Sequence, residues 1–403
     1  MKRIIGFLLL SVIFLGCSSS KPKPVAKKQE KNVIPAWFME IKDIKGYFIG
    51  AAAEKSTHLD FALKRAIQKS YSEVAKNVEV KLQGFTKLTR QEINNQYQDR
   101  LEYAYLLTTQ RLFSGIRILR QEVVREGMYY YAFIIAGIPT GEVADNFAES
   151  AGKELIENIK NSRTYKEWKN KPDNANLTIG RSARLTKPFT YPAWFLQQKE
   201  NTSGRIFVGY AKPSYYKENS ATEAIKDGVR NQMLFSSNHA TGQIINYLRY
   251  DENFVERDTY SEEINESALE TMVRNISVKD TVYLERMTLV AIGSGALKSK
   301  EMKSLNKLPG WIINLPEEKG YHYVVGVSPI YQYEKNSWLE AEKDARKKLA
   351  LYKMTDLYNK EFYNRSSLVG VSQFDLDVQL KSVEVVARAR DDHLFYVLTR
   401  IRK

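Results

Sequence analysis

The chain has 403 residues, of which 43% are hydrophobic and 27% charged, and these fractions exclude disorder throughout the chain. The single cysteine, Cys17, excludes a disulfide within the chain, so packing must stabilise the fold. The formal net charge of +14 permits an anionic lipid or acidic glycan as partner, but the basic residues are scattered among acidic ones, so we expect no nucleic-acid partner; the sequence specifies no small-molecule ligand.

Residues 1–16 have the layout of a signal peptide. A basic start, Met1-Lys2-Arg3, precedes an almost wholly apolar run from Ile4 to Leu15, and the small Gly16 follows. A helix over this run would be about 18 Å long, well short of a bilayer core of about 30 Å. We therefore expect an export signal and not a permanent transmembrane helix.

The segment Phe14-Leu15-Gly16-Cys17 resembles the lipobox of bacterial lipoproteins. The resemblance implies that Cys17 carries a diacylglycerol, that the chain is cut before it and that the new N-terminus is acylated, with palmitate as a typical chain. Phe14 and Leu15 differ from the usual Leu followed by a small residue. Ser18 replaces the Asp that retains some lipoproteins in the inner membrane, which favours the outer membrane of a cell envelope. The alternative is a plain secretory signal with a chance cysteine.

Residues 17–33 are predicted to be a basic flexible tether. The stretch 18–32 is rich in Pro and Ser, has no apolar periodicity, and contains five lysines against one glutamate. Its charge would attract anionic headgroups, at about 1 kcal/mol per residue near the surface. A merely soluble spacer is the alternative interpretation.

The rest of the chain shows one pattern three times, which predicts repeats at 34–141, 191–295 and 308–403. A helix and linker at 142–190 and a short linker at 296–307 would separate them. Each repeat begins with a Pro-x-Trp motif and continues with an apolar run that contains a glycine. The residues that recur in these two motifs are Trp37, Trp194 and Trp311, and Gly50, Gly209 and Gly326.

Each repeat is predicted to contain a strand, one or two helices and a closing antiparallel hairpin, which gives an α+β fold with a helix packed on a small sheet. Small residues in the first helix, Ala66, Gly228 and Ala345, are matched to one another and would allow a close approach to the sheet. Ser220 and Ser337 have the capping-box spacing of helix N-caps. Polar turns are expected at 125–127, 279–281 and 390–392, and a helix at 142–168.

This order of motifs looks like the LPP-twenty family of bacterial envelope lipoproteins, and the N-terminal domain of flagellar assembly protein T is similar in shape. The resemblance covers most of residues 34–403. It implies a lipid-anchored interaction module, facing the cell envelope or the periplasm, without catalysis. Three copies in one chain differ from the single domain of the type member, so the role of that protein does not transfer whole.

The sequence gives no sign of a reaction, and we predict no catalytic residue, metal or cofactor. The four histidines, His58, His239, His322 and His393, lack ligand spacing and are expected in turns or on the surface. The three repeat tryptophans are expected to pack in cores, with an aromatic binding platform as the alternative. One face of the strand at Tyr129–Tyr131 is a second possible binding surface.

The predicted function is a lipid-anchored, non-enzymatic interaction or scaffold protein, associated with the cell envelope or the flagellum, that contacts another envelope protein. Two alternatives stay open. A periplasmic enzyme would have a deep pocket between repeats with convergent carboxylates. A surface adhesin would bind acidic glycans through basic patches, and its binding would fall steeply with salt.

Overall fold

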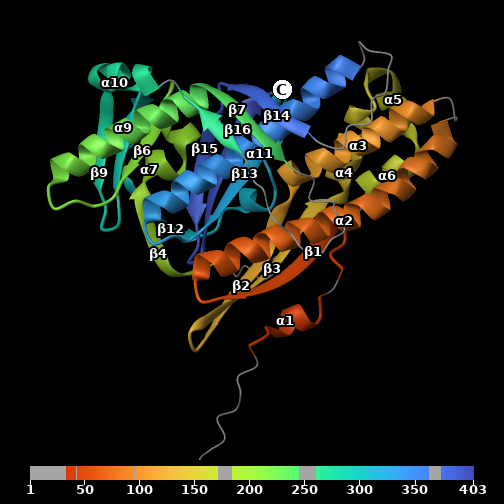
Figure 1. Cartoon of the computed structure of the whole chain (residues 1–403), viewed down its shortest axis with the longest axis horizontal. Helices are drawn as coiled ribbons and strands as arrows, with labels where there is room; N and C mark the ends of the chain where they lie inside the picture. Colours follow the sequence, from red (N-terminus) through yellow and green to blue (C-terminus); the bar gives the residue numbers. More distant parts are fainter. Residues whose placement is uncertain are drawn as a thin grey trace, which may run out of the picture. The chain divides into compact units, whose positions relative to one another are not determined.

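Helices alternate with small antiparallel sheets along the chain, which confirms the predicted α+β class (Figure 1). The computed structural model describes residues 33–41, 43–93, 97–170, 184–244, 260–264, 266–362 and 374–403. Within these ranges, no helix has the length and apolar character needed to cross a bilayer. The predicted signal peptide, Cys17 and nearly all of the tether lie outside the described residues.

The helices are α1 (Ala36–Met39), α2 (Leu59–Ile93), α3 (Gln98–Gly115), α4 (Thr140–Ser150), α5 (Lys153–Asn161), α6 (Arg163–Lys169), α7 (Ala193–Leu196), α8 (Gln198–Asn201), α9 (Lys217–Ser236), α10 (Glu266–Asn275), α11 (Glu334–Phe362) and the 3-10 turn η2 (Gly310–Ile312). The strands are β1 (Tyr47–Ser56), β2 (Arg117–Glu126), β3 (Tyr129–Pro139), β4 (Arg184–Pro192), β5 (Thr202–Ser203), β6 (Phe207–Ala211), β7 (Ser237–Ile244), β8 (Ser261–Glu263), β9 (Val278–Tyr283), β10 (Thr288–Ile292), β11 (Ala296–Leu297), β12 (Met302–Lys307), β13 (Tyr321–Pro329), β14 (Phe374–Lys381), β15 (Glu384–Arg390) and β16 (Leu394–Arg402).

Three of the sheets have the same strand order. They are β1-β3-β2, β6-β10-β9 and β13-β16-β15, so the last strand of each segment lies in the middle. A long helix follows the first strand and packs on it: α2, α9 and α11, respectively. We call the three stretches that contain these groups, 34–141, 191–295 and 308–403, the first, second and third modules. That they are copies of one sequence repeat stays a prediction.

The recurring glycines lie where helix and strand backbones touch. A Cβ on Gly209 would lie 2.5 Å from the backbone nitrogen of Gly228, and one on Gly326 would lie 2.6 Å from that of Ala345. In the first module, a Cβ on Gly50 would overlap the backbone at Ser70 and Val74, not at Ala66. The predicted match of Ala66 to Gly228 and Ala345 is therefore wrong.

The difference in the first module follows from the length of its first strand. β1 continues six residues beyond Gly50 to Ser56, whereas β6 ends two residues beyond Gly209. The helix that follows the longer strand must run an extra turn before its backbone returns to the glycine.

The helices also cap the outer edges of these first strands. The side-chain amides of Asn77 and Asn231 donate hydrogen bonds to the carbonyl oxygens of Ile49 and Val208, at 2.7 and 2.8 Å. Each acceptor immediately precedes the recurring glycine of its module. Such bonds occupy backbone groups that an edge strand would otherwise present for pairing with another chain.

In the third module, side chains of the long helix also bond to the backbone of the first strand. The Lys348 amine donates to the Val325 carbonyl oxygen at 2.7 Å, and the Asp344 carboxylate accepts the Val327 N–H at 2.8 Å. In the second module, Asp227 accepts the N–H of Tyr210 at 2.9 Å. The Asp contact therefore recurs with the same residue type in the second and third modules, whereas the donor to the carbonyl before the glycine changes from Asn to Lys.

Residues Ile34–Lys403 form one compact body in which the third module contacts both others. One hydrophobic cluster joins the second and third modules and includes Trp194, Phe195, Trp338 and Phe395. Another joins the first and third modules through α2, β3, β13 and β16. In addition, β7 pairs with β14, so one further sheet crosses from the second module to the third.

Two connecting segments differ from the predictions. The segment predicted to be a linker, 296–307, contains β11 and β12, which pair with β5 and β4. The single helix predicted at 142–168 is three helices, α4 to α6. Gly152, with φ of 91°, separates α4 from α5. Ser162 separates α5 from α6 and caps α6 by accepting the N–H of Tyr165 at 3.1 Å.

Two local predictions are also wrong. The turn expected at 279–281 lies inside β9, where Asp280 accepts a hydrogen bond from the Trp194 indole, and the turn falls after Tyr283. Ser220 and Ser337 lie within helices and do not cap them, because α9 and α11 begin three residues earlier. The turns at 125–127 and 390–392 lie where they were expected.

Candidate functional site

The three tryptophans lie in three different hydrophobic clusters and do not form a shared platform. Trp194 is fully buried, and its indole donates to Asp280 at 3.0 Å. Trp37 is half-buried, donates to Glu122 at 2.6 Å, and lies 4.4 Å from the Arg120 guanidinium. Trp311 is half-buried between the first and third modules. Packing, the predicted role, accounts for all three positions.

The histidines are also separate from one another, and in the described part of the chain no group of three His, Cys, Asp or Glu side chains is placed to hold a metal ion. His58 and His239 are exposed, as expected. His322 differs, because its ring stacks on Tyr352 with centroids 3.6 Å apart and burial lowers its pKa to about 3. The expectation of a surface histidine is wrong there, since a neutral imidazole packs like an aromatic ring.

A cleft of about 910 Å³ lies between the first and third modules and contains several carboxylates. Most of them are paired with cations: Glu142 with Arg117, Asp145 with Lys169, Glu149 with Arg111, and Glu318 with Lys199 and Arg400. Burial raises the pKa of Glu142, and Arg117 opposes that increase. These carboxylates hold neighbouring elements together, which is sufficient reason for their presence.

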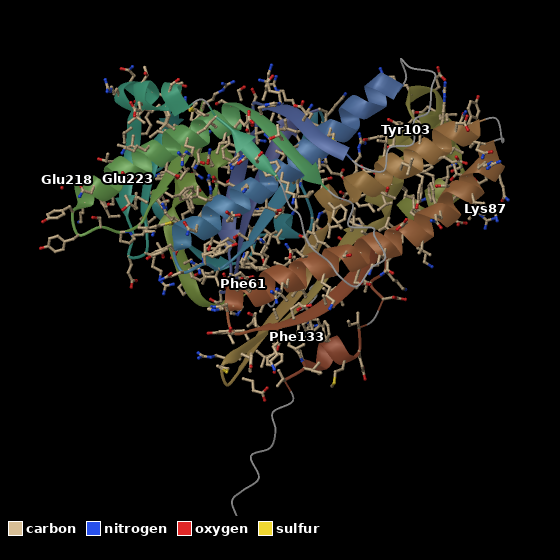
Figure 2. The ribbon with its side chains drawn as sticks, viewed as in Figure 1. Phe61, Lys87, Tyr103, Phe133, Glu218 and Glu223 are labelled. Atoms are coloured by element: carbon tan, nitrogen blue, oxygen red, sulfur yellow. The ribbon has the colours of Figure 1, made fainter. Side chains whose placement is uncertain are left out.

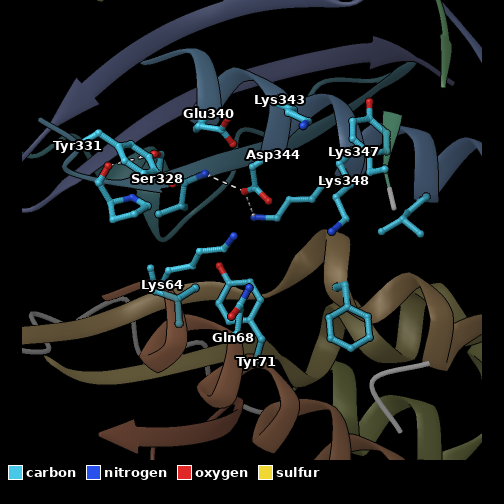
Figure 3. Close-up of a pocket in the computed structure, with 16 residues that line it drawn as sticks. Lys64, Gln68, Tyr71, Ser328, Tyr331, Glu340, Lys343, Asp344, Lys347 and Lys348 are labelled. Atoms are coloured by element: carbon cyan, nitrogen blue, oxygen red, sulfur yellow. Dashed lines mark hydrogen bonds and ion pairs between the residues drawn. The ribbon is translucent and has the colours of Figure 1, made fainter. Parts of the chain in front are cut away.

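A second cleft, of about 440 Å³, lies between α2 and α11, and we call it the α2–α11 cleft (Figure 3). It is lined by Lys64, Ile67, Gln68, Tyr71, Phe113, Tyr260, Val327, Ser328, Pro329, Tyr331, Glu340, Lys343, Asp344, Lys347, Lys348 and Leu351. The lining residues of each helix are three or four positions apart, so each helix presents one continuous face to the cleft.

Lysines from both sides dominate the charge of this cleft. Figure 3 shows Lys64 reaching from α2, and Lys347 from α11, into the space between the helices. Lys348 is buried, and its amine bonds to Asp344 at 2.9 Å. Burial lowers the pKa of Lys348 and Asp344 raises it, with a net increase, so the amine is charged.

Four exposed tyrosines lie in or against the segment between β6 and α9, and we call them the tyrosine patch. Tyr215 and Tyr216 are in the segment itself, and Tyr333 and Tyr283 contact the lysines at its two ends, Lys212 and Lys217. The side chains of Tyr215 and Tyr216 are 94% and 62% exposed, and their rings meet edge to face with centroids 5.1 Å apart. The patch lies beside the N-terminal end of α9, where Figure 2 labels Glu218 and Glu223.

Lysines hold the other two rings of the tyrosine patch. The Lys212 amine lies 3.5 Å from the ring centre of Tyr333, and the Lys217 amine lies 5.3 Å from that of Tyr283. Such cation–π contacts orient the rings without burying them. The strand predicted as a binding surface has a similar arrangement, because Tyr129 is exposed about as much as Tyr333 and the Lys55 amine lies 4.0 Å from its ring centre.

Sequence reasoning missed both sites. Lys343 and Lys347 stand four residues apart on one helix, which is a signal for a basic face, but Lys64 joins them only through the tertiary fold. The adjacent tyrosines Tyr215 and Tyr216 follow a proline and precede a predicted helix, so a loop was readable there, while their exposure was not.

The chain was also compared with known proteins. No protein-family model, curated protein or solved structure matches it. The resemblance of the repeats to the LPP-twenty family stays a prediction, and the function is inferred from the residues and their geometry.

Proposed function

We propose that this chain is a lipid-anchored protein of the bacterial cell envelope, held in the outer membrane through Cys17, that acts as a non-enzymatic interaction module. The observation that carries the proposal is the tyrosine patch. Tyrosine is enriched at protein interfaces because a large rigid ring contributes much contact area at low entropic cost. Tyr215 is 94% exposed, so its ring gains little packing energy within its own chain beyond the edge-to-face contact with Tyr216.

The way the buried charges are used supports a scaffold over a catalyst. Arg346 of the third module pairs with Glu262 of the second at 2.6 Å, and Arg117 of the first donates to the Ile313 carbonyl of the third at 2.9 Å. Buried polar groups need partners, and here the partners belong to a different module. The charges therefore fix the positions of the modules, which a rigid binding surface requires.

The anchor is supported by the sequence before the compact body. The body begins at Ile34, directly after the basic tether that follows Cys17. Two or more acyl chains hold a protein stably on a membrane, since each buried methylene contributes about 0.8 kcal/mol.

Photo-crosslinking in cells tests the interaction surface. A photoreactive amino acid replaces Tyr215, and the matched control replaces Lys87, an exposed residue of α2 in the first module (Figure 2). We expect a discrete crosslinked envelope protein from position 215 and not from position 87. Absence of any adduct at 215, or the same adducts at both positions, would contradict an interface at the patch.

Metabolic labelling with a fatty-acid probe tests the anchor separately. The wild-type chain should be labelled and sediment with membranes, whereas Cys17→Ala should be unlabelled and soluble in the periplasm. An unlabelled wild-type chain would exclude the lipoprotein assignment and leave the crosslinking result standing.

A further inference from the structure

We propose that a cleft between the second and third modules is a binding site for a neutral, hydroxyl-rich ligand of the sugar class. The cleft lies beside α9 and β15, and we call it the α9–β15 cleft. Its lining residues come from 198–208, 231–236 and 382–388, together with Glu342 and Arg400, so a ligand there would contact both modules. The site is separate from the tyrosine patch and does not depend on the function proposed for that patch.

The first step is a buried carboxylate in the lining that has an unused acceptor. The Glu342 side chain is fully buried, and its Oε1 accepts hydrogen bonds from the Arg388 guanidinium and the Tyr210 hydroxyl, both at 2.6 Å. Its Oε2 is also buried and has no hydrogen-bond partner among the described residues. A buried acceptor without a donor is costly, so a ligand that supplies the donor is favoured. Because Arg388 already neutralises the carboxylate, the missing donor is an uncharged one, such as a hydroxyl.

The second step excludes an anionic ligand. Lys199 and Arg400, two further cations of the lining, both pair with Glu318 at 2.8 Å. Arg205, for which the described residues supply no ion pair, is exposed, so water already solvates its charge. An anion would therefore gain little from these cations, and the Glu342 carboxylate would repel it.

The third step is a pair of hydroxyl groups beside the carboxylate. Ser236 and Ser382 both line the cleft, and the Ser382 N–H donates to the Ser236 carbonyl oxygen at 3.1 Å. The next N–H, of Val383, donates to the Phe235 carbonyl oxygen at 2.9 Å, so this edge of the cleft is fixed across the two modules. Ser382 is held there with φ of 55°, a conformation that side chains rarely adopt. A serine hydroxyl both donates and accepts, as the hydroxyls of a sugar do.

The fourth step is the shape of the remaining wall. A volume of about 400 Å³ lies within the range typical of small-molecule sites, roughly 300–1,000 Å³. A sugar ring has C–H groups on its faces and hydroxyls around its edge, which matches an apolar wall with a few polar groups. The apolar side chains of the lining are Ile206, Phe207, Val208, Phe235, Val383 and Val385.

Saturation-transfer NMR titration of the full chain, in a detergent without a sugar headgroup, tests the site. The probes share one type of ring: glucose and N-acetylglucosamine are neutral, glucosamine carries an ammonium group, and glucuronate carries a carboxylate. We expect saturable binding of a neutral sugar, about tenfold tighter than that of either charged form. Equal or tighter binding of a charged form, or no saturable binding of either neutral sugar, would overturn the proposal.

Ser382→Gly separates loss of binding from damage to the fold. Glycine adopts a φ of 55° without strain, so the variant should unfold at no lower temperature than the wild type. Loss of the hydroxyl should nevertheless weaken binding of the neutral sugar several-fold. Ser277→Gly is the matched control, because Ser277 is an exposed serine of the second module outside the cleft, and it should bind like the wild type. Unchanged binding in Ser382→Gly, or an equal loss in both variants, would contradict a site in this cleft.

Glu342→Met/Arg388→Met tests the acceptor itself. The double variant removes the carboxylate together with its counterion, so no unpaired charge is left buried and circular dichroism should show a folded chain. We expect no measurable binding of the neutral sugars. A folded double variant that binds them like the wild type would show that Glu342 is not the acceptor, and the proposal would fail.

Discussion

Arg388 of β15 and Glu342 of α11 form an ion pair of 2.6 Å in which the side chains are 1% and 0% exposed. The Tyr210 hydroxyl, from the second module, donates to the same carboxylate at 2.6 Å. Arg388 in turn donates to the amide oxygen of Gln198 at 2.7 Å. A pair that belongs to the third module therefore also connects it to the second, as the Arg346–Glu262 pair does.

Breaking this pair should destabilise the protein strongly. Glu342→Gln leaves the Arg388 charge buried without a counterion, and we expect the free energy of unfolding to fall by about 3 kcal/mol in urea titrations. The double variant Glu342→Met/Arg388→Met removes both charges and should recover more than half of that loss. An additive loss in the double variant would contradict a coupled pair. Lys226→Ala is the control: Lys226 is in an exposed pair with Glu223, so its loss should change the free energy of unfolding by about 0.5 kcal/mol or less.

The close approach of helix and strand predicts opposite effects for two glycines. Gly209→Ala inserts a methyl group against the α9 backbone, and we expect a loss of about 3 kcal/mol. Gly84→Ala, where nothing lies within 4 Å, removes backbone freedom from the middle of α2 and should stabilise by about 0.5–1 kcal/mol. Thermal unfolding of the two variants checks the signs, and a tolerated Gly209→Ala would refute the contact.

Asp227 predicts a loss of stability as pH rises. Burial, with a contribution from nearby Glu342, raises its pKa from 3.8 to about 7, against the lowering effects of the Tyr210 N–H, Lys335 and Arg230. The folded state thus holds the proton more tightly than the unfolded state does. The stability that protonated Asp227 contributes is full below about pH 4 and is lost as pH rises to about 7, at about 1.4 kcal/mol per unit of pKa difference.

Asp227→Asn isolates this effect because its side-chain oxygen can still accept the Tyr210 N–H. We expect the stability of the variant relative to wild type to increase by about 2 kcal/mol or more between pH 4 and pH 8, measured by urea unfolding. A difference that does not change with pH would show that Asp227 is ionised without penalty.

His322 predicts the reverse dependence. Burial, together with the positive charges of Lys403, Arg111, Arg117 and Lys353, lowers its pKa from 6.5 to about 3. The folded state binds the proton more weakly than the unfolded state does. The stability that neutral His322 contributes is therefore full above about pH 6.5 and is lost as pH falls toward 3.

His322→Phe keeps a ring against Tyr352 and removes the titration. Relative to wild type, the variant should gain about 2 kcal/mol between pH 7.5 and pH 5. Chemical denaturation at the two pH values measures the gain, and equal differences at both would contradict a neutral imidazole stacked on Tyr352.

Local patterns predicted the elements well where burial and periodicity coincide. The apolar runs around Gly50, Gly209 and Gly326 are strands, and the helical face that begins at Leu59 belongs to α2. The match of Ala66 with Gly228 failed because the length of β1, which no helical pattern encodes, sets where α2 crosses its strand. The cleft lysines escaped prediction because Lys64 and Lys347 are brought together by packing between modules, and one sequence contains no record of that distance.

The central position of the third module has a consequence for biosynthesis. The ribosome releases the first and second modules before the third, yet the apolar side chains of Ala62, Leu63 and Tyr210 belong to clusters that the third module completes. Until residues 321–402 emerge, those surfaces have no partner and offer binding sites to chaperones.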